Sequence, residues 1–299
     1  MWFKNLRIYR LDPHFGVSAQ QLVEMLAKHS FTPGSSQEPL SLGWVPPREG
    51  GELVHEVNGQ YLICMRAEKK LLPSAVVNQS AREKAREIEE QQGFKPGRKQ
   101  MKEIKEQIII DLMPRSHAVQ RDTMVWIDTQ NHWFVIDAAA VAKSDEVLGL
   151  LAKSVEPFPV QPLYTEQSPG AAMTSWLVDE EQLANFTVDQ DTELRSTGDS
   201  GAAVRYVKQS ADIDEVRKHV EAGKQCTRLA MTWADRISFV LTDALDVKRV
   251  APLDILTEKQ DIYAVNDDDI FDADMTLMAS ELSGLLASIV ELLGGERTS

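Results

Sequence analysis

The chain has 299 residues, of which 43% are hydrophobic and 26% charged, and its formal net charge is −14. This composition is typical of a folded protein, and the length allows either two domains or one core with a large insertion. We expect neither a membrane span nor a secretory signal, because no stretch approaches about 18 uninterrupted apolar residues and Met1–Arg7 is too mixed in character.

The N-terminal residues predict strands and one helix. Residues 2–11 indicate a strand, and Ser18 is a candidate N-cap for a helix whose apolar residues follow at helical spacing. Gly43–Pro47 predicts a turn. Asn58-Gly59 lies between two apolar runs within residues 53–65, which is a strong signal for a β-hairpin.

The chain becomes charged and helix-favouring from Ser74 to Leu112, with breaks at Gly93 and at Pro96-Gly97. In the second piece, apolar residues share one helical face: Met101, Ile104, Ile108 and Leu112. Pro114 ends this piece. We therefore predict a helical insertion at 74–119 that packs on one side.

Strands are predicted again at 124–127 and 133–136, followed by a helix at 144–154. Three prolines between residues 157 and 162 mark a boundary. The prediction is therefore a central α/β unit made of residues 1–73 and 120–162, into which the helical segment is inserted.

Residues 163–299 predict a second α+β unit. Its elements are a strand at 204–209 with a polar end, a helix at 213–222, paired strands at 228–233 and 237–241, and a last helix at 273–293. The predicted fold class of the whole chain is therefore α+β.

No catalytic motif is convincing. Gly198–Gly201 has the letters of a serine-protease nucleophile loop, but no histidine lies in a partner motif, and 189–201 is polar and turn-rich, so we predict a solvated loop. The carboxylate-dense run Asn266–Asp274 fits no EF-hand register and predicts an acidic helix N-terminus. Zinc spacings and phosphate-binding glycine loops are absent, so we expect no enzyme, no metal and no cofactor.

Two cysteines, Cys64 and Cys226, both lie in apolar contexts. They predict buried free thiols, with one disulfide as the alternative. Sparse cysteine without an export signal indicates a reducing cytoplasm.

A basic island interrupts this acidic chain. Residues 66–121 hold 13 Lys/Arg against 8 Asp/Glu, a local balance of +5 that leaves −19 for the rest. Arg98, Lys102 and Lys105 form a stripe beside the apolar face of the second helix, and Arg115 and Arg121 follow it. A one-sided stripe suits phosphate contacts, whereas the interleaved glutamates leave open a merely solvated helical face.

The full chain resembles the RdgC family of bacterial recombination-associated proteins. Short segments in a specific order and spacing carry the resemblance: Trp2–Leu6, Tyr9–Leu11, Phe31–Pro33, Gly43–Pro47, Asn58–Gln60, Leu72–Ser74, Pro114-Arg115, Trp126–Thr129, Glu221–Lys224, Phe271–Asp274 and Leu292–Glu296.

The resemblance implies an elongated, curved monomer that closes with a second copy into a ring-shaped homodimer. Such a ring encircles duplex DNA through a basic hole, keeps its acidic surface outside, and antagonises RecA-dependent strand exchange without catalysis. It also implies a cytoplasmic, nucleoid-associated protein, and leaves open whether single-stranded DNA is bound.

Two further sites come from the resemblance. Lys208-Gln209 matches a Lys-Gln pair at the tip of a finger-like hairpin near the DNA. His117 occupies a gate position between subunits, where a relative carries an aromatic residue after Pro-Arg-x. The alternative function is an acidic protein-interaction module that binds the recombinase directly, with DNA affinity incidental.

Overall fold

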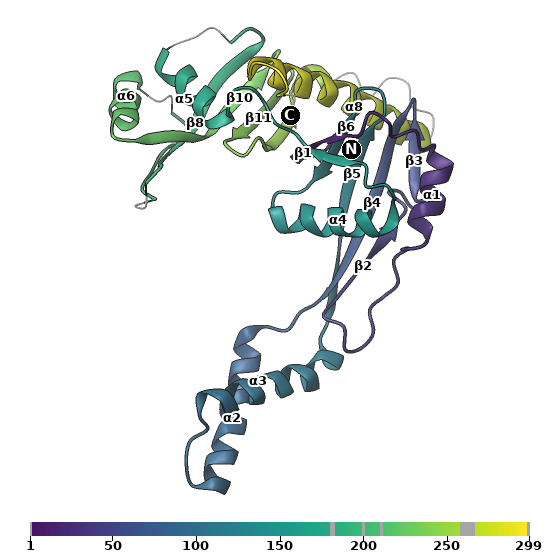
Figure 1. Cartoon of the computed structure of the whole chain (residues 1–299), viewed down its shortest axis with the longest axis vertical. Helices are drawn as coiled ribbons and strands as arrows, with labels where there is room; N and C mark the ends of the chain where they lie inside the picture. The colour runs from purple at the N-terminus through teal and green to yellow at the C-terminus, as the bar shows by residue number, and fades with distance from the viewer. Residues whose placement is uncertain (1, 180–182, 199–200, 210–211, 258–266, 298–299) are drawn as a thin grey trace.

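The chain is described by a computed structural model that covers residues 2–179, 183–198, 201–209, 212–257 and 267–297. A large antiparallel sheet carries helices on its faces, and a helical hairpin projects from it, so that the molecule is elongated (Figure 1). The predicted α+β class is confirmed.

The strands of the sheet are β1 Asn5–Leu11, β2 Leu40–Val45, β3 Val54–Val57, β4 Gln60–Lys70, β5 Ala118–Asp128, β6 Trp133–Asp137, β7 Val160–Pro162, β8 Phe186–Ser196, β9 Ala203–Tyr206, β10 Lys224–Trp233, β11 Ile237–Thr242 and β12 Val247–Pro252. Their spatial order is β2-β4-β5-β6-β1-β12-β11-β10-β8-β9, with β3 also paired to β4 and β7 to β1.

The helices are α1 Ala19–Ala27, α2 Ser74–Gln92, α3 Arg98–Leu112, the 3-10 turn η1 Met113–Arg115, α4 Val141–Ser154, α5 Pro169–Asp179, α6 Ile213–Glu221, α7 Asp254–Thr257 and α8 Asp267–Leu292.

Local sequence signals account for several of these boundaries. Asn58 and Gly59 both have positive φ, 50° and 75°, as a two-residue hairpin turn requires, and they join β3 to β4. Ser18 caps α1 and forms a capping box with Gln21. The hairpin and the helix start were therefore predicted correctly.

The inserted segment is the helical hairpin α2–α3. Gly93 ends α2 in the left-handed conformation at φ 79°, as the glycine predicted. The hairpin stands on β4 and β5, whose ladder runs unbroken from Gln60↔Asp128 to Lys70↔Ala118 and carries it away from the rest of the sheet (Figure 1). Ile104 of α3 is buried, as its place on the predicted apolar face requires.

Two apolar clusters occupy opposite faces of the sheet. One lies under α5, α6 and α8, and the other lies under α1 and α4. In Figure 1, α8 runs along the top of the sheet, α4 lies across the strands lower down, and the helical hairpin projects below the strand ends.

Asp269–Leu292 is long and apolar enough to cross a membrane by composition, but half of it is buried, which fits a core helix.

Strands β1 and β12 join the two predicted units into one sheet. Asn5 pairs with Lys248, and Leu6 pairs with Val247. The sheet therefore continues past the proline-rich segment at residues 157–162, and the division of the chain into domains stays a prediction.

Three local predictions were wrong or incomplete. Gly43–Pro47 does not begin with a turn, because residues 40–45 form β2 paired with β4. The polar segment 189–201 is not a loop up to Ser196, because β8 pairs with β10 and β9 through those residues. Helix α5 and strand β12 were not predicted.

Both cysteines are buried free thiols, as predicted. Burial raises the pKa of Cys64 and of Cys226 to about 12. Three residues of the weighed motifs, Asp199, Ser200 and Asn266, lie outside the described residues. From the acidic run, Asp272 joins α8 to β3, with its Oδ1 2.8 Å from Nε2 of His55.

Candidate nucleic-acid interface

The first basic surface follows α3. Arg98 and Lys102 are exposed and Lys105 is half-buried, so all three side chains reach solvent beside the buried Ile104. Lys102 lies 3.6 Å from Glu106, and among the described residues no carboxylate lies within ion-pair distance of Arg98 or Lys105. The three cations of the predicted stripe are therefore accessible to solvent, and their role in binding stays a prediction.

The remaining residues of the island lie at the base of the helical hairpin. Arg115 ends η1, His117 links it to β5, and Arg121 lies on β5 opposite Ala67 of β4. All three are exposed, and the carbonyl of His117 accepts a hydrogen bond from the amide of Leu71 (2.7 Å). Because α3 rises about 1.5 Å per residue, Arg98 at its start lies roughly 21 Å along the helix from its end.

Lys208 and Gln209 are exposed and follow β9. Lys208 has φ 55°, and its amide donates to Oδ1 of Asp191 on β8 (2.9 Å). The connection between β8 and β9 lies at the other end of β9. Strand β9 pairs with β8, and Tyr206, just before this pair, lies opposite Thr192, the β8–β9 partner farthest from the turn. The structure therefore places Lys208 and Gln209 beside the sheet, and not at a hairpin tip as the resemblance implied.

A second basic surface was not anticipated. On β1, Leu6 and Ile8 face the cluster under α8, so Asn5 and Tyr9 face the opposite side, where α4 packs. Cross-strand pairing continues from Asn5 through Lys248 to Val240. On that side of β8–β12 no described helix covers the strands and Arg205, Arg228 and Arg249 are exposed, so this part of the sheet has an open face.

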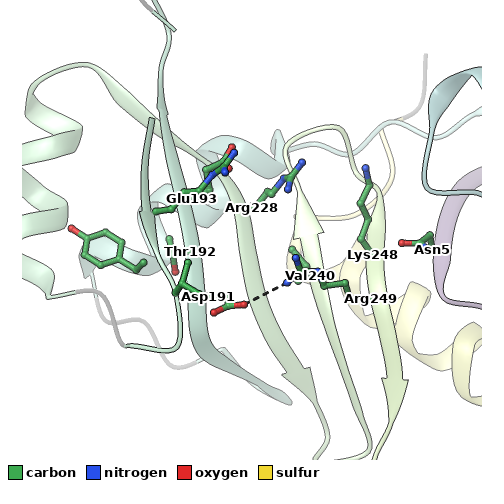
Figure 2. A pocket seen from close by; sticks show the side chains of 11 residues that line it. Asn5, Asp191, Thr192, Glu193, Arg228, Val240, Lys248 and Arg249 are labelled. Atoms are coloured by element: carbon green, nitrogen blue, oxygen red, sulfur yellow. Dashed lines mark hydrogen bonds and ion pairs between the residues drawn. The ribbon is translucent and has the colours of Figure 1, made fainter. Parts of the chain in front are cut away.

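The open face contains a shallow pocket with a volume of about 290 Å³ (Figure 2). Four of its lining residues are cations and two are carboxylates: Arg205, Arg228, Lys248, Arg249, Asp191 and Glu193. The balance is therefore +2, on a chain whose net charge is −14.

Glu193 organises the arginines at one end of this pocket. It is 4% exposed, and its carboxylate accepts hydrogen bonds from Arg205, from Arg195 and from Thr227 (3.1 Å each for the last two). Burial alone raises the pKa of Glu193, but the hydrogen bonds from Arg205, Thr227 and Arg195 outweigh it and hold the pKa below the usual 4.5. The carboxylate is therefore charged at neutral pH and fixes Arg205 over the strand.

The other three cations of the pocket come from β12 and β10. Arg249 lies at a bulge between β11 and β12 with φ 53°, and its Nη1 is 3.5 Å from Oδ2 of Asp191. Nζ of Lys248 is 3.6 Å from Asp246 and donates to the carbonyl of Ala139 (3.3 Å), just before α4. Arg228 is exposed on β10 opposite Glu193.

These positions suit a polyanion better than a small substrate. From β12 to β9 there are four strand spacings of about 4.8 Å, or roughly 19 Å. Over that length a DNA duplex presents about 11 phosphate charges. Within the described ranges, no group of three or more His, Cys, Asp or Glu side chains could hold a metal ion.

Sequence reasoning could not find this surface as a whole, because its cations come from β9, β10 and β12 and are scattered among acidic residues. The adjacent Lys248-Arg249 pair was the available local signal.

Comparison with known proteins gives a consistent result over nearly the whole chain. A family model described as "Putative exonuclease, RdgC" matches residues 1–296. The chain is 62% identical to the "Recombination-associated protein RdgC" of Bordetella parapertussis over 297 residues, which is 99% of both chains. Proteins with the same name from a Janthinobacterium species and from Cupriavidus necator are 58% and 56% identical, again over 99% of both chains.

Proposed function

Because the chain belongs to the RdgC family, we propose that it is a recombination-associated protein that binds duplex DNA without sequence specificity. The observation that carries the proposal is the segregation of charge. Two cationic surfaces, along α3 and on the open sheet face, interrupt a chain of net charge −14. Phosphate contacts need cations of this kind, whereas base reading needs an element that enters a groove.

A ring-shaped homodimer would use both surfaces at once. The helical hairpin projects from the ends of β4 and β5, beyond α4 (Figure 1), so two copies that meet at their hairpins would enclose the basic surfaces and leave acidic ones outside. Several apolar side chains at and near the hairpin are exposed: Leu71, Val76, Ile109, Ile110 and Val119. Leu71, whose amide donates to the carbonyl of His117, and Val119 of β5 are the ones next to the gate position, and these exposed side chains would contact the second copy there.

Enclosing the duplex accounts for a negative effect on recombination. A duplex held inside a protein ring is unavailable to a RecA filament, so the protein would reduce strand exchange without contacting the recombinase. It would act in the cytoplasm, on the nucleoid. The prediction that the chain is not an enzyme stays a prediction; incubating end-labelled DNA with the protein and Mg²⁺ tests the exonuclease named in the family description.

The salt dependence of DNA binding tests the proposal. One variant replaces Arg98, Lys102 and Lys105 with Gln, and a second replaces Arg228, Lys248 and Arg249 with Gln. The logarithm of the DNA association constant falls with the logarithm of the salt concentration, with a slope of about −0.9 for each phosphate contact. Each triple variant should therefore show a slope that is less steep by up to roughly 2.7. Lys28→Gln, an exposed cation at the end of α1, is the control. Salt-independent affinity in the wild type would contradict the proposal.

The alternative of an acidic protein-interaction module is separated by strand exchange. A variant that carries both sets of substitutions and no longer binds DNA should no longer inhibit RecA. If inhibition survives intact, the protein acts on the recombinase directly and DNA affinity is incidental.

A further inference from the structure

The free end of the helical hairpin carries an exposed aromatic side chain. Phe94 lies in the connection between α2 and α3 and is 62% exposed, compared with 53% for Tyr164 and 44% for Phe158. Figure 1 shows this end of the hairpin as the part of the chain farthest from the sheet. Burial within the described fold therefore does not explain an aromatic residue at this position.

The residues around Phe94 are strongly basic. From Gly93 to Lys102 the chain holds four cations and no carboxylate: Lys95, Arg98, Lys99 and Lys102. No acidic residue lies in the first turn of α3, although a helix N-terminus favours acids and disfavours cations. These cations therefore destabilise the start of α3, so stabilising the fold does not explain their position, and binding of another molecule does.

The backbone around Phe94 leaves room for another molecule. Gly93 has φ 79°, and Gly97 has extended backbone; a Cβ added at either glycine would meet no atom within 4 Å. Two glycines with open space around them thus flank Phe94 and Lys95 in the sequence, so that a partner can approach this loop closely.

We propose that Phe94 and the surrounding cations form a binding site for unpaired bases of DNA. An aromatic side chain stacks on the face of any base that is not stacked in a duplex, while nearby Lys and Arg hold the adjoining phosphates. The proposal rests on the proposed DNA-binding function and adds to it a preference for single-stranded segments, located at the end of the hairpin.

Two other occupants fit the charges less well. A second copy that met this loop with its own loop would bring two clusters of the same charge together, which is repulsive. One phenyl ring would bury little apolar area in an anionic membrane, and stable membrane anchoring needs a second apolar group beside it. Unpaired DNA uses the ring and the cations together.

The test compares two DNA ligands by fluorescence anisotropy at one salt concentration: a labelled 20-nucleotide oligo(dT) and a 20-base-pair duplex. Phe94→Ala should weaken oligo(dT) binding about 5-fold or more and change duplex binding less than 2-fold. Phe94→Trp should retain or improve oligo(dT) binding. Phe158→Ala is the matched control, because it removes an exposed phenyl ring elsewhere, and Lys95→Gln should weaken both ligands.

Each contrary result is distinct. If Phe94→Ala weakens the affinity for oligo(dT) and for duplex equally, or weakens neither, the proposed site is wrong. This holds even if the wild-type affinity for duplex still falls with salt, as the proposed function requires. Loss of binding to vesicles containing anionic lipid, or loss of dimer, without a change in oligo(dT) affinity would assign Phe94 to a membrane or to a second copy. A wild type that binds neither DNA would remove the proposed function itself.

Discussion

Replacing Glu193 by Gln should destabilise the fold and strengthen DNA binding at the same time. The carboxylate is buried on the open face and accepts hydrogen bonds from Arg205, Arg195 and Thr227. Glutamine keeps the volume but removes the charge. The local balance of the pocket then rises from +2 to +3, because one of its two carboxylates is lost.

The size of both effects follows from exposure. Hydrogen bonds to a charged group contribute about 1.5–3 kcal/mol each, but the side chains of Arg205 and Arg195 are 61% and 48% exposed and regain water. We therefore expect the free energy of unfolding to fall by about 2 kcal/mol in total. Removing one negative charge near a phosphate should tighten DNA binding about 2- to 5-fold at low salt, and less at high salt.

The stability difference should depend on pH. The folded state lowers the pKa of Glu193, so its contribution is fully present above the unfolded value near 4.5 and is lost as the pH falls through the lower folded value. Wild type and Glu193→Gln should therefore differ in urea unfolding at pH 7 and converge in strong acid.

The matched control is Glu281→Gln. Glu281 is 8% exposed on α8 and forms a two-pronged pair with Arg236, but it lies on the other side of the sheet. It should lose comparable stability, measured by tryptophan fluorescence in urea, and bind a labelled duplex unchanged. If Glu193→Gln loses stability but binds DNA no more tightly than Glu281→Gln, the open face does not contact DNA.

Two further predictions concern packing and the gate. Gly43→Ala should prevent normal pairing of β2 and lower the melting temperature by several degrees, because the added Cβ would lie 2.2 Å from Cα of Phe31. The control is Gly97→Ala, which adds a Cβ in open space and should leave the melting temperature unchanged. Equal melting temperatures of the two variants would contradict the close approach of Gly43 to Phe31. His117→Phe should strengthen dimerisation, because a phenyl ring at the gate would bury more apolar area against the second copy than an imidazole does. Sedimentation of both proteins over a concentration series checks this, and equal dimer affinity removes the gate role of His117.

Local sequence determined the elements whose signals are complete within a few residues. Asn58-Gly59 specifies a tight turn because both residues tolerate positive φ, and Gly93 ends α2 for the same reason. The spacing of Met101, Ile104 and Ile108 places the cations of α3 on its solvent side. These features suffice to predict the helical insertion and its basic stripe.

Other elements depend on partners far away in the chain. Strand β2 contains Gly43 and ends before two prolines, so it has the composition of a turn, yet β4 supplies its hydrogen bonds. Strand β8 is polar because one of its faces is largely in solvent, where Glu193 pairs with Arg205 of β9 and Asp191 pairs with Arg249 of β12. Local composition cannot reveal either strand.

The candidate site divides in the same way. The basic stripe of α3 follows from helical periodicity alone, since its members are three or four residues apart. The open face exists because β1 pairs with β12, which brings Asn5 beside Lys248, and because the helices of that half pack on the opposite side. Cross-strand register is a non-local property of the folded chain, so only the tertiary structure could bring Arg205, Arg228 and Lys248 onto one surface.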